Sequence, residues 1–157
     1  MNKAIILSVF IALPASKLLA QVNTPTAPAA VIPADRFRVL GDSLTPGASR
    51  TAQLGKGPGL TYAVTHRDST GGLEVHRDWT DVFVIESGSA TVLTGGTLAG
   101  ATESTPGEWR GGTLAGGTHA AVKVGDVVVI PAGTPHQMIL KPSERITYLA
   151  FKVAAPK

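Results

Sequence analysis

The 157-residue sequence predicts an all-β protein with a single domain. Short apolar stretches alternate with turns, and the chain contains 18 glycines and 11 prolines. Regularly spaced short strands separated by glycine and proline are typical of a β-sandwich or a β-barrel. No stretch shows a helical period of any length, so we expect strands to form the core.

The first 20 residues are interpreted as a secretory signal peptide. Lys3 precedes an apolar run over residues 4–14, and Ala20 offers a small residue for cleavage. Because this run is short for a bilayer, we expect no membrane span after cleavage and a periplasmic or secreted protein. Lys3 and Lys17 both lie in this segment, so cleavage of the signal peptide leaves a nearly neutral chain. The remaining chain has no basic cluster that would bind nucleic acid.

Residues 21–59 are predicted to form an N-terminal arm and linker. Three prolines and several small residues before residue 34 disfavour a helix or a central strand. Residues 35–40 are compatible with either a short helical turn or an edge strand. The barrel itself is expected to span residues 60–153.

The alternation of side chains predicts the strands of this barrel. Residues 60–66 alternate with a period of two, a glycine-containing turn follows, and Leu73-Glu74-Val75-His76 alternates again. Glu74 and His76 should therefore project from the same face of one strand. The other candidate strands lie at residues 81–85, 90–93, 127–130, 136–140 and 146–153.

A hexapeptide, Gly-Gly-Thr-Leu-Ala-Gly, occurs at residues 95–100 and again at residues 111–116. Two copies are too few for a solenoid, so a local duplication or a long hairpin is the better interpretation. The segment is either a flexible lid that carries Trp109 and His119 or a surface excursion without chemical consequence. We expect His119 to be solvated.

Gly41-Asp42-Ser43-Leu44 resembles the nucleophile block of the GDSL esterases and lipases. A serine nucleophile needs a general base and oxyanion donors, and the resemblance implies that a later asparagine and an Asp-x-x-His sequence supply them. The only asparagines are Asn2 and Asn23, and no aspartate is followed three residues later by histidine. We therefore interpret Ser43 as part of an ordinary turn.

Two other motifs resemble those of the cupin superfamily. Residues 125–136, GDVVVIPAGTPH, match the glycine, proline, glycine and metal-binding histidine of the second cupin motif. Glu74-Val75-His76, Asp81 and Gly88 resemble the first motif, with Glu74 replacing its first histidine and Asp81 replacing its glutamate. The stretch between the motifs is unusually long for the family. The resemblance implies a single-domain jelly-roll β-barrel that can hold a metal.

Together, the resemblance and the strand pattern predict a divalent metal ion near Glu74, His76, Asp81 and His136. Because the chain has no cysteine, the ligands must be nitrogen and oxygen, which suits iron, manganese, zinc or nickel. If both carboxylates bind, the site is formally neutral, whereas a single bound carboxylate leaves the other free to act as a general base. His66 is an additional candidate ligand, although a lone histidine in a strand is more often a hydrogen-bonded structural residue.

The expected inner wall is apolar and includes Phe83, Ile85, Met138 and Leu140, which share strand faces with Asp81 or His136. Such a cavity suits a small-molecule ligand. The resemblance implies either a metal-dependent enzyme, dioxygenase-like or isomerase-like, or a non-catalytic module that binds a metal or a small molecule. It also implies that two copies can pair through edge strands as a homodimer.

Overall fold

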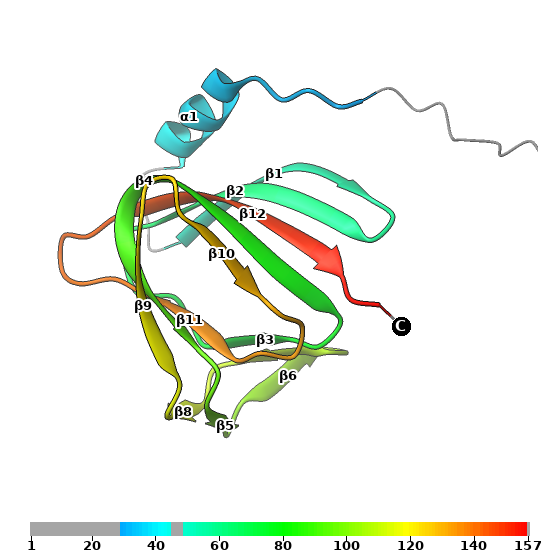
Figure 1. Cartoon of the computed structure of the whole chain (residues 1–157), viewed down its shortest axis with the longest axis vertical. Helices are drawn as coiled ribbons and strands as arrows, with labels where there is room; N and C mark the ends of the chain where they lie inside the picture. The colour runs from blue at the N-terminus through cyan, green and yellow to red at the C-terminus, as the bar shows by residue number, and fades with distance from the viewer. Residues whose placement is uncertain (1–28, 45–48, 157) are drawn as a thin grey trace, which may run out of the picture. The chain divides into compact units, whose positions relative to one another are not determined.

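The computed structural model describes residues 29–44 and 49–156, so the expected signal peptide and most of the proline-rich arm lie outside it. The described chain forms antiparallel strands that curl around a core, preceded by a short helix (Figure 1). The helix is α1 (Ala34–Ser43), and the strands are β1 (Ser49–Gly57), β2 (Leu60–Arg67), β3 (Glu74–His76), β4 (Trp79–Thr94), β5 (Thr97–Ala99), β6 (Thr102–Thr105), β7 (Glu108–Arg110), β8 (Thr113–Ala115), β9 (Thr118–Lys123), β10 (Val127–Ile130), β11 (His136–Ile139) and β12 (Ile146–Ala154).

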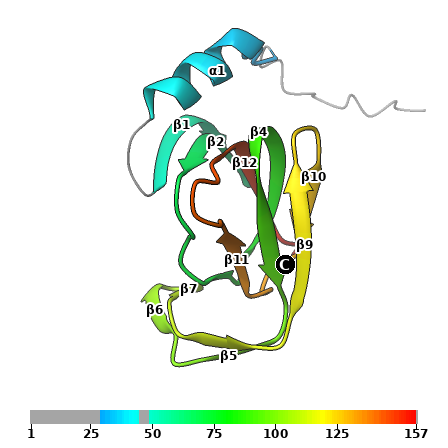
Figure 2. The same ribbon diagram turned by 90° about the vertical axis from the view of Figure 1, so that its left-hand side faces the viewer.

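The strands form two layers that share the long strand β4. The first half of β4 pairs with β12 and β10, and its second half pairs with β11 and β9. One layer therefore has the order β1-β2-β12-β4-β10, and the other has the order β9-β4-β11-β3-β7-β6 (Figure 2). This arrangement confirms the prediction of an all-β, jelly-roll architecture.

Strand β4 passes from one layer to the other at Gly88. This glycine has a φ of 77°, and a Cβ atom there would lie 1.8 Å from the carbonyl oxygen of Arg145. Both the left-handed backbone and the close approach of the neighbouring chain therefore require glycine.

Replacing Gly88 with alanine is expected to destabilise the protein by at least about 1 kcal/mol more than replacing Gly95 with alanine. Gly95 has the same φ of 77°, but a Cβ atom there would meet nothing within 4 Å. The pair therefore separates the collision with the Arg145 carbonyl from the strain of the backbone. Chemical denaturation measures the free energy of unfolding of both variants. Equal losses of stability in the two variants would contradict the prediction that the collision with the Arg145 carbonyl adds to the cost.

The N-terminal boundary differs from the expected one, because the sheet already begins at Ser49 rather than at residue 60. Strand β1 pairs with β2 over its length, with a bulge between Gln53 and Gly55. Its polar residues and glycines hide the pattern of an edge strand, which has to bury only one face. Residues 35–40, left open between helix and edge strand, belong to α1.

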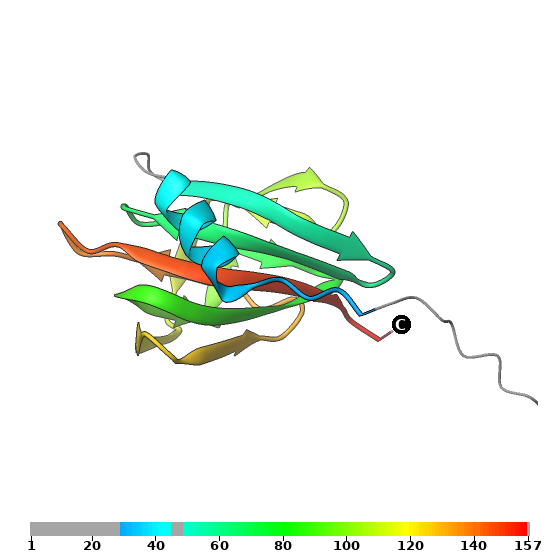
Figure 3. The ribbon, with the colours of Figure 1, turned by 90° about the horizontal axis from the view of Figure 1, so that it is seen from above.

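Helix α1 was not visible as a period in the sequence because it is short and only partly buried. It begins after Pro33, whose extended backbone precedes the helix, and Asp35 lies in its first turn. Figure 3 shows α1 lying across the layer that contains β2 and β12. Gly41 faces Thr147 of β12, because a Cβ atom on this glycine would lie 3.0 Å from the Thr147 methyl group. No helix in the described part of the chain is long and apolar enough to cross a membrane.

The two hexapeptide copies pair with each other. Strands β5 and β8 are antiparallel, with Leu98 opposite Leu114, and the segment between them forms the hairpin β6–β7. Strand β7 then pairs with β3, so that Trp109 lies opposite Val75. The prediction of a long hairpin is confirmed, and its strand β7 is part of the sheet.

Candidate metal centre

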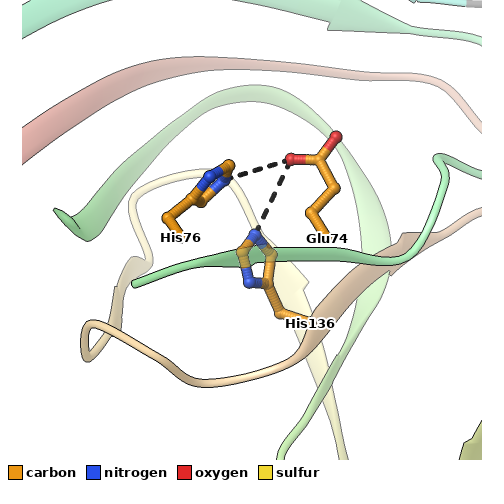
Figure 4. Close-up of side chains that lie close together, drawn as sticks. All are labelled: Glu74, His76 and His136. Atoms are coloured by element: carbon orange, nitrogen blue, oxygen red, sulfur yellow. Dashed lines mark ion pairs between the residues drawn. The ribbon is translucent and has the colours of Figure 1, made fainter. Parts of the chain in front are cut away.

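Three predicted ligands converge at one end of the barrel interior. Glu74 and His76 project from the same face of β3, and His136, at the start of β11, is paired with Glu74 in the sheet register. Their ligand atoms all lie within 4.8 Å of one another. Figure 4 shows the three side chains pointing toward one another. The Nε2 atom of His76 is 3.3 Å from Oε2 of Glu74, and Nε2 of His136 is 3.9 Å from the same oxygen.

Asp81 completes the predicted group of four residues. Its Oδ2 atom lies 3.3 Å from Nε2 of His76 and 3.3 Å from Nε2 of His136. The other carboxylate oxygen accepts a hydrogen bond from Nζ of Lys152 at 3.0 Å. Only 2% of Asp81 is exposed, so Lys152 provides the compensating charge that a buried carboxylate needs.

Both carboxylates are held in their charged form. Burial by itself raises the pKa of Glu74, but the hydrogen bond with His76 and the positive charges of Arg110, His136 and His76 outweigh burial and lower this pKa to about 2. For Asp81, burial again raises the pKa, and the hydrogen bond with His136 together with the charge of Lys152 lowers it below its usual range.

The metal-free protein should therefore lose stability in acid. A carboxyl whose pKa is lower in the folded chain stabilises the fold above its unfolded pKa, and this contribution disappears as the pH falls through the folded value. For Glu74 the interval runs from 4.5 down to about 2. Glu74→Gln should flatten the loss of stability across this interval in denaturation measured at a series of pH values. An unchanged pH dependence would contradict the lowered pKa of Glu74.

Hydrogen bonds fix the orientation of the two imidazole rings. The Nδ1 atom of His136 is 3.0 Å from the carbonyl oxygen of Thr134, so Nδ1 is the donor and Nε2 keeps its lone pair for the cluster. The Nδ1 atom of His76 contacts Oε2 of Glu108, which leaves its Nε2 directed at Glu74 and Asp81. Two imidazole nitrogens with one or two carboxylate oxygens form a donor set that suits a divalent transition metal.

No protein-family model and no curated protein matches the sequence. The structure matches the cupin domain of Schizosaccharomyces pombe Cnp3 with 14% identity and a TM-score of 0.52, covering 68% of this chain and 65% of that one. The chain has the cupin fold. A predicted oxalate decarboxylase from Thermotoga maritima is also similar, with 15% identity and a TM-score of 0.51 over 68% of this chain and 81% of that chain.

The TT1209 protein of Thermus thermophilus is a third similar structure, with 15% identity and a TM-score of 0.53 over 72% of this chain and 90% of that chain. The match spans just under two thirds of the length of the Schizosaccharomyces pombe chain. At these identities the likeness concerns the fold.

A carboxylate that the sequence did not reveal lies behind His76. Strand β7 pairs with β3 so that Glu108 is opposite His76 and Arg110 is opposite Glu74. Oε2 of Glu108 contacts Nδ1 of His76 and accepts a hydrogen bond from Nη2 of Arg110 at 3.1 Å. Nη1 of Arg110 lies 3.8 Å from Oε2 of Glu74. The β6–β7 hairpin thus contributes a carboxylate and a cation to the surroundings of the cluster.

A cavity of about 250 Å³ adjoins the cluster. Phe83 and Met138 line it, as the sequence predicted, but Ile85 and Leu140 do not. Ile85 and Leu140 lie two residues farther along the chain than Phe83 and Met138, and all four side chains belong to the hydrophobic core. The remaining lining residues are Thr51, Gln53, Thr61, Ala63, Thr65, Arg67, Gly72, Glu74, His76, Asp81, Val92, His136, Gln137, Tyr148, Ala150 and Lys152.

The structure does not bring His66 into the cluster. The β2 residues that line the cavity are Thr61, Ala63, Thr65 and Arg67, so His66 belongs to the opposite face of the strand. It is buried, and its Nδ1 atom is 2.9 Å from the hydroxyl oxygen of Thr147. The structure thus places His66 outside the group of converging ligands and gives it a hydrogen-bonded position in the interior.

The other residues singled out in the sequence also lie away from the cluster. The Ser43 hydroxyl donates to the carbonyl of Leu40 at 2.7 Å, as expected for a residue at the end of a helix. His119 is exposed on β9. Trp109 lies on β7, with the Arg77 guanidinium 5.9 Å from the centre of its ring.

Proposed function

We propose that this cupin binds one divalent metal ion through Glu74, His76 and His136 and holds a small organic molecule in the adjoining cavity. The convergence of three donor atoms within 4.8 Å is the observation that carries this proposal. Buried polar groups need partners, and an ion would satisfy both imidazole nitrogens and the carboxylate at once. Iron, manganese, zinc and nickel suit this donor set.

Asp81 has a different role from the other three residues. One of its oxygens is bound by Lys152, and the other faces both imidazoles. Asp81 can therefore act as a fourth ligand, or as a carboxylate that accepts a proton from a bound molecule. In either role, Lys152 keeps it charged and in place.

We favour a metal-dependent enzyme over a non-catalytic module because the cluster opens into a cavity rather than being enclosed by protein. A bound ion with open positions would act as a Lewis acid on a ligand oxygen. The residues of this chain would position the ligand: Phe83 and Met138 supply apolar contact, while Asp81 lies beside the ion. The alternative of a binding module is supported by the two carboxylates, whose charge weakens the acidity of a divalent ion.

The proposal is tested by equilibrating chelator-treated protein with iron(II), manganese(II), zinc(II) and nickel(II) separately and measuring bound metal after gel filtration. We expect one ion per chain for at least one of the four. Retention of none of them would refute the metal site. Turnover that requires the ion and disappears in Asp81→Asn, while the ion stays bound, would decide for the enzyme over the binding module.

A further inference from the structure

Two cations lie in the wall of the cavity, and they differ in their surroundings. Lys152 is paired with Asp81. Arg67, at the end of β2, donates from Nε to the hydroxyl of Tyr148 at 2.9 Å, and no carboxylate in the described part of the chain forms an ion pair with it. Arg67 therefore brings to the cavity a positive charge that is not held in an ion pair with a described carboxylate.

The position of the Arg67 guanidinium is determined by its neighbours. A Cβ atom on Gly71 would lie 2.5 Å from Nη1 of Arg67, so glycine provides the space that the guanidinium occupies. Gly71 is itself fixed, because its N–H donates to the Met138 carbonyl at 2.8 Å and its carbonyl accepts from Nε2 of Gln137 at 2.7 Å. With Nε directed at Tyr148, the two terminal nitrogens of Arg67 can donate to a ligand in the cavity.

The charges of the cavity wall favour an anion once a metal is bound. Glu74 and Asp81 are balanced by Arg67 and Lys152, so the ion itself provides a net positive charge in the cavity. The apolar side chains of Phe83 and Met138 lower the local dielectric and strengthen this field. An uncharged ligand would not form an ion pair with the guanidinium.

We propose that the cavity binds a small organic carboxylate, with one carboxylate group paired to the guanidinium of Arg67 and the rest of the molecule directed toward the metal ligands. The inference rests on the proposed metal site and adds the chemical class of its ligand. An arginine donates two parallel N–H groups to the two oxygens of a carboxylate, a geometry that lysine cannot reproduce. The volume of about 250 Å³ limits the ligand to a small molecule.

The test is calorimetric titration of zinc-loaded protein with malonate and succinate, and with malonamide and succinamide as uncharged molecules of the same shape. We expect at least one dianion to bind about tenfold or more tightly than its diamide. Arg67→Gln should remove this preference. Gly71→Ala should weaken it too, because the added methyl group displaces the guanidinium while its charge is kept.

The zinc content of each variant is measured alongside and should stay at the wild-type level. Arg77→Gln is the matched control, since Arg77 is an exposed arginine outside the cavity wall and its loss should leave dianion affinity unchanged. Equal affinity for dianions and diamides, or an unaltered preference in Arg67→Gln, would overturn the anion site while zinc content still reports on the metal site. Failure of the wild-type protein to take up zinc or any other divalent ion would overturn the proposed function and this inference with it.

Discussion

Replacing His76 with alanine is expected to lower the affinity of the protein for a divalent ion by more than about 100-fold. Even the loss of a hydrogen-bond partner behind a metal-bound histidine typically costs about 10–100-fold, and this substitution removes the imidazole itself. The change also takes away a group that lies 3.3 Å from both Glu74 and Asp81, so two buried carboxylates lose a shared neighbour. Titration of chelator-treated protein with zinc measures the loss.

His66→Ala is the matched control for this prediction. His66 is buried like His76, but it lies on the face of β2 that points away from the cavity, where its ring contacts Thr147. Its replacement should cost folding stability and leave zinc affinity unchanged. If both variants bound zinc as the wild-type protein does, His76 would not be a ligand. If both lost zinc equally, the effect of His76→Ala would be one of folding rather than of coordination.

Replacing Glu108 with alanine is expected to lower metal affinity by about 10–100-fold. Glu108 contacts Nδ1 of His76 and thereby orients the ring so that Nε2 faces the cluster. It also holds Arg110 near Glu74 through the hydrogen bond at 3.1 Å. Glu108 is thus a positioning residue for His76, and the measurement is the same zinc titration.

Two further variants separate positioning from a general effect on the hairpin. Glu108→Gln keeps an oxygen that can accept the Nδ1–H of His76, so it should restore part of the affinity. Glu103→Gln is the control, because Glu103 lies on the same hairpin and accepts the Gly107 N–H at 2.8 Å without contacting the cluster. The visible spectrum of the cobalt-substituted protein should change in Glu108→Ala and not in Glu103→Gln. Identical spectra for these two variants would contradict the positioning role.

The sequence predicted most of the cluster, because strand periodicity determines which side chains share a face. Glu74 and His76 are two residues apart on β3, His136 begins β11, and Asp81 lies near the start of β4. Strands β3 and β11 are neighbours in one layer, whereas the Asp81 segment of β4 belongs to the other layer, so the convergence of the four residues also requires the two layers to face each other. Periodicity does not give depth along the barrel, which is why Ile85 and Leu140 were expected in the cavity wall although they do not line it.

The contribution of the hairpin could not be predicted from local pattern. Glu108 reaches His76 only because β7 pairs with β3 in one register, and a shift by one residue would direct Trp109 there instead. The repeat made the pairing of the two hexapeptide copies visible, but not the pairing of β7 with β3. Arg67 was missed for a related reason: its significance depends on its contacts with Gly71, in the loop after β2, and with Tyr148 of β12.

The most direct test of the account is a crystal structure of the zinc-loaded protein with anomalous diffraction measured on both sides of the zinc absorption edge. We expect a single anomalous peak per chain, within coordination distance of Nε2 of His76, Nε2 of His136 and a carboxylate oxygen of Glu74. A peak bound elsewhere, or no peak in crystals grown with zinc, would contradict the proposed metal centre.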